Sequence, residues 1–168
     1  MRSILSILCI LVIFSCSGAK STTTANKPNK RNLKGTWEVT NIRFVGEEGL
    51  YKAMLFDSAD SACFKNSEWV FIPNNATGKF TLNQTSNCKA MTQRIIWSFF
   101  ESGDSTYDFQ FKLVDEKNKP LADKKTGYRL KITELTNSEM ETRLKTTYQG
   151  QAFDVVLKFQ KTSDDINL

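Results

Sequence analysis

The feature that most limits the fold of this chain is an alternation of apolar and polar residues. Between residues 107 and 113 every second side chain is apolar, and the side chains between them are charged or amide groups. The same period of two recurs in residues 128–132 and 153–159. Successive side chains of a β-strand point to opposite faces, so this pattern predicts strands with one buried and one solvated face.

Eight segments of this kind follow one another between short polar turns. They cover residues 35–44, 68–72, 78–84, 91–101, 106–115, 127–135, 139–148 and 152–160. Residues 50–56 could form a short helix in the first loop. We therefore predict an all-β fold, an eight-stranded antiparallel up-and-down barrel, whose closure leaves no free strand edge. A sandwich of two sheets is the alternative, since alternation alone does not separate the two architectures.

The N-terminal residues have a different composition. A basic start precedes an apolar run of 11 residues from Ile4 to Phe14. That length suits the hydrophobic region of a signal peptide and is too short to span a bilayer, which takes about 20 residues. We predict a signal peptide at residues 1–15, a flexible basic tether at 16–32, the barrel at 33–162 and a C-terminal tail at 163–168.

The formal net charge of +5 belongs to the tether. Residues 16–34 hold five basic and no acidic residues, whereas residues 35–168 hold 17 basic and 18 acidic residues. Basic residues beside a lipid anchor favour an anionic bilayer surface. The near-neutral barrel has no basic patch for nucleic acid, which excludes that class of partner. We expect the barrel to be a monomer.

The segment Ile13-Phe14-Ser15-Cys16 resembles the bacterial lipobox, with an aliphatic residue at −3 and a small residue at −1 before a cysteine. The resemblance implies lipidation of Cys16 and cleavage just before it. An ordinary signal peptide, cut after Ser15 or Ala19, is the alternative. The residues after Cys16 include neither an aspartate at +2 nor an acidic cluster. In this they resemble lipoproteins that lie on the periplasmic side of the outer membrane. Surface display is the alternative.

Two cysteines, Cys63 and Cys88, lie in the predicted exported domain. Such a pair is most simply a disulfide, and two buried thiols are the alternative. The turn of residues 73–78 supports the bridge if its centre lies between Asn75 and Ala76. Facing residues of that hairpin would share the buried face and sit close enough to be bridged. The register predicts three facing pairs: Phe71 with Phe80, Trp69 with Leu82, and Cys63 with Cys88.

The first predicted strand opens with Leu33-Lys34-Gly35-Thr36-Trp37, which resembles the Gly-x-Trp opening of lipocalins. In that family glycine admits a tight entry into the strand and the tryptophan fills the floor of the barrel. Lipocalins also place an arginine of the last strand over this tryptophan, where this chain offers only Lys158 or Lys161. With the lipobox and eight strands, residues 33–162 resemble the lipocalin-like lipoproteins of Bacteroidetes.

The chain contains no histidine, no glycine-rich phosphate loop and no Cys-x-x-Cys motif. The missing histidine excludes Ser-His-Asp triads, most zinc sites and the usual general base at neutral pH. We therefore expect a protein that is not an enzyme, with neither a catalytic residue, a metal nor a cofactor.

Aromatic side chains dominate the predicted inner face. Phe80 and Phe153 belong to this face. The candidates for contact with a ligand are its other rings, Trp69, Phe71, Trp97, Phe99, Phe109, Phe111, Tyr128 and Tyr148. Two interpretations stand equally. The barrel holds a small hydrophobic ligand, as eight-stranded barrels can. Alternatively the rings fill the barrel, and the domain is a structural or protein-interaction module of the cell envelope.

Two sites of O-glycosylation are implied by a further resemblance. Asp57-Ser58-Ala59 and Asp60-Ser61-Ala62 resemble the Asp-(Ser/Thr)-small pattern glycosylated in Bacteroidetes, and Asp104-Ser105-Thr106 is a third match. The implied sites are Ser58 and Ser61. An ordinary polar loop is the alternative.

Overall fold

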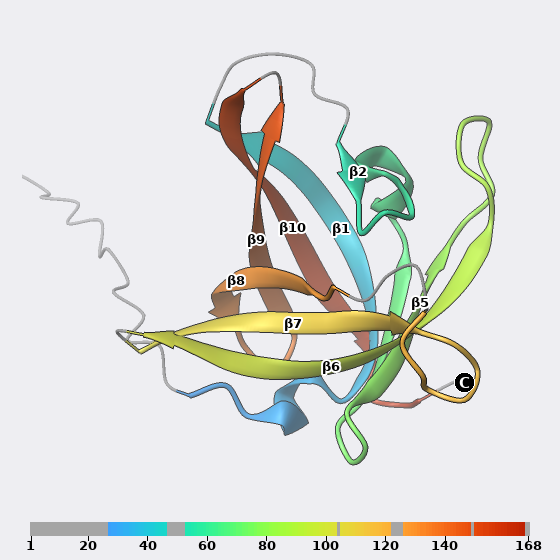
Figure 1. The fold of residues 1–168 in the computed structure, drawn as a ribbon. Helices are drawn as coiled ribbons and strands as arrows, with labels where there is room; N and C mark the ends of the chain where they lie inside the picture. Colours follow the sequence, from blue (N-terminus) through green and yellow to red (C-terminus); the bar gives the residue numbers. More distant parts are fainter. Residues whose placement is uncertain (1–26, 47–52, 104, 122–125, 149, 167–168) are drawn as a thin grey trace, which may run out of the picture.

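The structure is a computed structural model that describes residues 27–46, 53–103, 105–121, 126–148 and 150–166, with Tyr148 described in its backbone alone. Eight of its strands form one closed antiparallel barrel (Figure 1). They are β1 (Gly35–Val45), β4 (Glu68–Ile72), β5 (Thr77–Leu82), β6 (Met91–Gly103), β7 (Thr106–Val114), β8 (Tyr128–Leu135), β9 (Glu139–Tyr148) and β10 (Gln151–Ser163). Consecutive strands are neighbours, and β1 pairs with both β4 and β10. The predicted barrel is confirmed, and the sandwich is wrong.

The hairpin β4–β5 has a different register from the predicted one. Ile72 pairs with Thr77, so Trp69 faces Phe80 and Phe71 faces Gly78. The predicted pairs were displaced by two residues, because Thr77 already belongs to β5 and Asn75 Oδ1 accepts hydrogen bonds from its backbone and its hydroxyl group. Side chains alternate with a period of two, so this error left the aromatic rings on the correct, inner face.

One end of the barrel, where β1 begins, is closed by the N-terminal segment, and we call this end the floor. The short helix η1 (Lys30–Leu33) runs beneath it, and Leu33 is fully buried. The indole nitrogen of Trp37 donates a hydrogen bond of 2.9 Å to the carbonyl of Leu33. Residues 30–32, predicted to lie in the flexible tether, are therefore folded against the barrel.

A lysine takes the place over the floor tryptophan where lipocalins carry an arginine. Lys161 Nζ lies 5.2 Å from the centroid of the Trp37 ring. The other candidate, Lys158, points away and pairs with Glu139 at 3.4 Å. The structure thus decides between the two lysines that the sequence offered.

The opposite end, which we call the mouth, carries a segment of residues 53–64. It consists of a small hairpin, β2 (Met54–Leu55) and β3 (Ala59–Asp60), followed by the helix η2 (Ser61–Phe64) (Figure 1). The helix predicted at residues 50–56 is wrong for residues 53–56, and residues 50–52 lie outside the described part. Phe56 and Asp57 adopt left-handed φ angles of 53° and 47°, which turn the chain back on itself.

A disulfide between Cys63 and Cys88 ties η2 to the loop after β5. The predicted bridge is confirmed, but its predicted geometry is wrong. The two cysteines are not opposed in a strand ladder, because β4 starts only at Glu68 and β5 ends at Leu82. In the described residues no helix is both long and apolar enough to span a membrane.

Candidate ligand-binding site in the barrel

The half of the barrel wall formed by β4 to β7 is filled by aromatic rings. Trp69 stacks on Phe80 with centroids 4.8 Å apart, and Phe109 lies 5.6 Å from both Phe71 and Phe111. All five side chains are buried. Edge-to-face and offset contacts of this kind stabilise a core beyond the area they bury. In this half, the interpretation of the aromatic rings as core holds.

The other half of the wall, formed by β1, β8, β9 and β10, mixes aliphatic side chains with aromatic rings, and part of its inner face is exposed to solvent. Ile42, Phe44, Ile132 and Leu144 are half-buried although they belong to the inner face. Their ladder partners place them there: Ile42 is opposite Leu157, and both Phe44 and Leu144 are opposite Val155.

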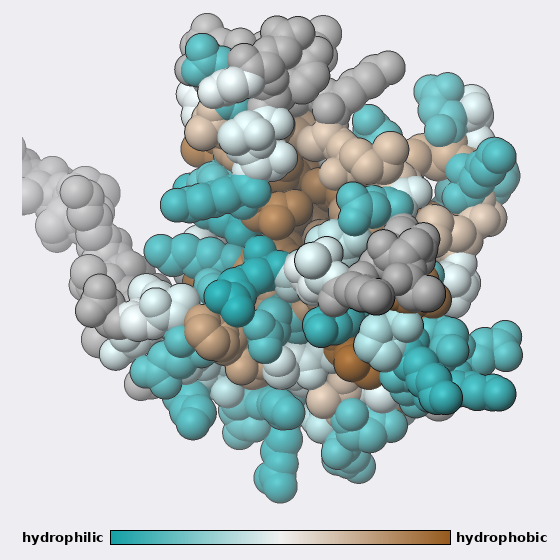
Figure 2. Space-filling view, in the orientation of Figure 1, coloured by the Kyte–Doolittle hydropathy of each residue, from teal (hydrophilic) through white to brown (hydrophobic). Residues whose placement is uncertain are grey.

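Side chains on the inner face of a solid barrel would be buried, so solvent must reach these four. We call the space that they border the aliphatic recess. Figure 2 shows hydrophobic atoms set below a polar rim where β9 and β10 run in Figure 1.

One polar atom is buried beside the aliphatic recess. Thr142 is opposite Ile132 on β8 and Leu157 on β10, which places its side chain on the inner face. Its relative exposure is 0 %, and its hydroxyl oxygen has no hydrogen-bond partner among the described residues. Buried hydroxyl groups are nearly always hydrogen-bonded, so this one calls for an explanation.

Phe56 of the mouth segment closes the aromatic side of the barrel. Its ring lies 4.9 Å from Phe111, 5.2 Å from Phe64 and 5.3 Å from Tyr128. The Tyr128 hydroxyl donates a hydrogen bond of 2.8 Å to the carboxylate of Asp57. The segment is therefore held at the mouth by ring packing, by this hydrogen bond and by the disulfide at Cys63.

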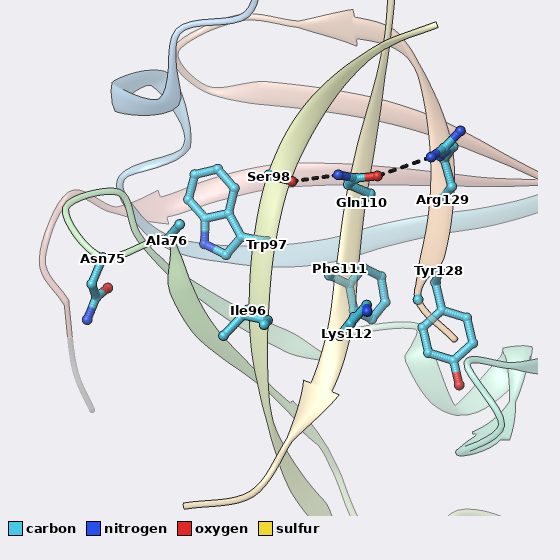
Figure 3. A pocket seen from close by; sticks show the side chains of 11 residues that line it. Asn75, Ala76, Ile96, Trp97, Ser98, Gln110, Phe111, Lys112, Tyr128 and Arg129 are labelled. Atoms are coloured by element: carbon cyan, nitrogen blue, oxygen red, sulfur yellow. Dashed lines mark hydrogen bonds between the residues drawn. The ribbon is translucent and has the colours of Figure 1, made fainter. Parts of the chain in front are cut away.

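A second hollow, of 530 Å³, lies on the outer wall across β6, β7 and β8 (Figure 3). It is bordered by outward-facing Ser98, Gln110, Lys112 and Arg129, and we call it the outer groove. Gln110 donates a hydrogen bond of 2.8 Å to Ser98 and accepts one of 3.4 Å from Arg129. The Arg129 guanidinium also lies 4.0 Å from the ring centroid of Phe100, one of the exposed large apolar side chains.

The candidate ligand residues separate into three groups. Trp69, Phe71 and Phe109 are packed in the aromatic half and expose no more than 1 %. A second group forms the wall behind the outer groove: Trp97, Phe111 and Tyr128. Phe99 is half-buried with its ring 5.7 Å from Trp97, and the side chain of Tyr148 lies outside the described residues, as does Cys16.

The two serines implied as glycosylation sites lie in the mouth segment. Ser58 is half-buried and its hydroxyl donates to the carbonyl of Phe56. Ser61 begins η2 with a relative exposure of 3 %, so its side chain is not accessible in this conformation. The third match includes Asp104, which lies outside the described residues.

The residues that border the aliphatic recess were not among the candidates. Sequence reasoning chose only aromatic residues as candidates, so it missed Ile42, Ile132 and Leu144, and it also missed the aromatic Phe44. The signal that could have found them is the inner-face row of β9, in which Thr142 lies between the apolar side chains of Met140 and Leu144. The local sequence gives no sign that Phe56 packs into the mouth of the barrel, because its position depends on a left-handed turn. The described residues contain no cluster of three or more potential metal ligands.

Comparison with known proteins identifies the family of this chain through its sequence. The sequence profile of the lipocalin-like domain matches residues 33–142. No curated protein sequence matches the chain. Among solved structures, the odorant-binding protein from bovine nasal mucosa is 17 % identical, with a TM-score of 0.41, and the match covers 82 % of this chain and 76 % of that one.

The complex of bovine odorant-binding protein with a selenium-containing odorant is 16 % identical, with the same TM-score and a coverage of 82 % and 75 %. At this low identity and TM-score, the two solved structures carry no argument about this chain beyond its own strand order. The family is carried by the profile match, by the closed eight-stranded barrel and by the tryptophan at its floor. By these observations the chain belongs to the lipocalin-like domain family.

Proposed function

We propose that this protein binds a small hydrophobic molecule in the aliphatic recess and that it is not an enzyme. The observation that carries the proposal is the partial exposure of four inward-facing apolar side chains, Ile42, Phe44, Ile132 and Leu144. Exposed apolar surface costs about 25 cal/mol per Å². An apolar occupant would remove this surface from water without displacing any packed ring of the aromatic half.

Binding is tested by calorimetric titration of the soluble Cys16→Ala protein with 1-octanol. Leu144→Gln places an amide in the aliphatic recess, and it should weaken binding at least tenfold. Thr147→Gln is the matched control, because Thr147 is an exposed residue of the same strand. Failure of the unsubstituted barrel to bind apolar probes, or equal binding by both variants, would contradict the proposal.

We further propose that the barrel is a monomer anchored by lipid at Cys16, on the periplasmic side of the outer membrane, as in lipocalin-like lipoproteins of Bacteroidetes. The lipobox and the basic residues after it support this location, since basic residues favour an anionic bilayer surface. Mass spectrometry should find acyl chains on Cys16, and Cys16→Ala should leave unprocessed or soluble material without acyl chains. Added protease should cut the tether only after cell lysis, and cutting in intact cells would overturn the placement.

A second candidate function is protein interaction through the outer groove. Arg129 at the border of the groove lies over the exposed ring of Phe100, and these two residue types are enriched at interfaces. Arg129→Ala with Phe100→Ser should then abolish capture of a partner by cross-linking in whole cells, while 1-octanol binding is retained. An unchanged cross-linking pattern would remove this candidate.

A further inference from the structure

We propose that the ligand of the aliphatic recess is an aliphatic chain with an uncharged oxygen, a hydroxyl or carbonyl group, at its buried end, and that Thr142 binds this oxygen. The inference rests on the proposed function and adds the chemical class of the ligand. Its starting point is the hydroxyl of Thr142, which is fully buried on the inner face and has no hydrogen-bond partner among the described residues.

The place of Thr142 explains why a ligand should supply the missing partner. Its ladder neighbours Ile132 and Leu157, and Met140 and Leu144 on its own strand, all carry apolar side chains. Three of these side chains can neither donate nor accept a hydrogen bond, and the thioether of Met140 is only a weak acceptor. Ile132 and Leu144 also border the aliphatic recess. The hydroxyl itself has no exposed surface, so a ligand oxygen reaches it only when these half-buried side chains move aside. A threonine hydroxyl can donate and accept, and it therefore fits both an alcohol and a carbonyl oxygen.

The charges around the barrel exclude a carboxylate at this position. Apart from Lys161, the charged side chains of β9 and β10 face outward, and two pairs form there: Arg143 with Asp154 at 3.7 Å, and Lys158 with Glu139 at 3.4 Å. Arg143 Nε, the other buried polar atom without a partner in the described residues, belongs to this outer face. Lys161 lies at the floor against Trp37. A carboxylate beside Thr142 would be buried without a cation, which is strongly unfavourable.

The test compares three probes of equal chain length, 1-octanol, octane and octanoate at pH 7, in competition with a fluorescent apolar dye. The wild-type barrel should bind 1-octanol at least tenfold more tightly than octanoate. Thr142→Val keeps the shape of the side chain and removes the hydroxyl group. It should weaken 1-octanol binding about five- to tenfold, the range of one hydrogen bond, and leave octane binding unchanged.

Two further variants control for packing. Thr142→Ser keeps the hydroxyl group and should retain the preference of the wild type for 1-octanol over octane. Thr147→Val makes the same exchange on an exposed residue of the same strand and should change no affinity. Urea unfolding should show that Thr142→Val is at least as stable as the wild type, because it removes a buried hydroxyl group without a partner.

The possible failures are distinguishable. If 1-octanol and octane bind to Thr142→Val with the same loss, or with none, Thr142 does not bind the ligand oxygen and only this inference falls. If octanoate binds to the wild type as tightly as 1-octanol, the uncharged class is wrong. If no probe displaces the dye from any variant, the proposed function fails and takes this inference with it.

Discussion

Lys161 and Trp37 form a contact between the last and the first strand of the barrel, with the ammonium group 5.2 Å from the ring centroid. The Lys161 side chain is largely buried and its Nζ also pairs with Asp164 at 3.1 Å. A cation over an indole ring contributes about 0.5–2 kcal/mol, and more when it is desolvated. The pair therefore joins the two strands that close the barrel.

From this contact we predict that Lys161→Met lowers the free energy of unfolding by about 1 kcal/mol. Lys161→Arg should retain most of this stabilisation, since a guanidinium group can also stack on an indole ring. Urea unfolding followed by tryptophan fluorescence measures both. Lys158→Met, which removes an exposed charge of the same strand, is the matched control and should cost less. A result in which both methionine variants are equally stable would refute the role of Lys161.

Removal of the disulfide should loosen the mouth segment. Cys63 and Cys88 are 25 residues apart in the sequence, and closing a loop of that size is worth about 3 kcal/mol by chain entropy. The double variant with alanine at both positions should lose about that much stability in urea. Peptide mapping without reductant should first show the two cysteines joined in the wild type. An unfolding midpoint that does not move on reduction would contradict the prediction.

Phe56→Ala should destabilise the barrel more than its loop position suggests. The variant removes a buried ring that contacts Phe64, Trp69, Phe111 and Tyr128, and such substitutions cost about 3–5 kcal/mol. Phe100→Ala, at a ring that is 38 % exposed, should cost less than about 1 kcal/mol. Thermal unfolding of both proteins measures the difference. Equal losses would show that Phe56 does not close the barrel in solution.

Glu141 should make stability depend on acid pH. Burial alone would raise the pKa of this carboxyl group, but hydrogen bonds from Arg43 and Thr133 and the charges of Arg43 and Arg143 lower it overall. A carboxyl group with a lowered pKa stabilises the fold above its unfolded pKa, which is about 4.5. This stabilisation is lost as the pH falls below 4.5 and then through the lowered pKa that Glu141 has in the folded protein.

Glu141→Gln should therefore be less stable than the wild type at pH 7, and the difference should shrink between pH 5 and pH 3. Urea unfolding across that interval measures it. Glu139→Gln, on the same strand, tests whether the effect belongs to Glu141. A difference that stays constant with pH would show that the carboxylate of Glu141 does not act through its charge.

The strands could be predicted from sequence because their information is local. Tyr107, Phe109 and Phe111 alternate with polar residues, and such a pattern fits a pleated sheet with one wet face. The register of β4 and β5 was missed because it depends on which residue ends the turn. Thr77 looked like part of the turn, and only its hydrogen bonds with Asn75 show that it begins the strand.

The candidate site was harder to predict because its contacts are not local. Trp69 and Phe71 were expected to contact a ligand, yet the rings of β5, β6 and β7 fill the space before them. The incomplete filling beside Leu144 results from the volumes of side chains on four strands together. These four strands are far apart in the sequence, so no short segment of it reveals their combined side-chain volume. Phe56 was assigned to a helix because a turn of two left-handed residues other than glycine is rare.

Both described ends of the chain lie at the floor. The helix η1 packs under Trp37 there, and the carbonyl of Asp165 accepts a hydrogen bond of 3.0 Å from the Thr36 hydroxyl. Whatever holds this protein by either end, a bilayer, a fusion partner or a sensor chip, therefore attaches on the side away from the mouth. The opening stays free to face the surrounding solution, so immobilised protein should exchange small molecules as readily as free protein.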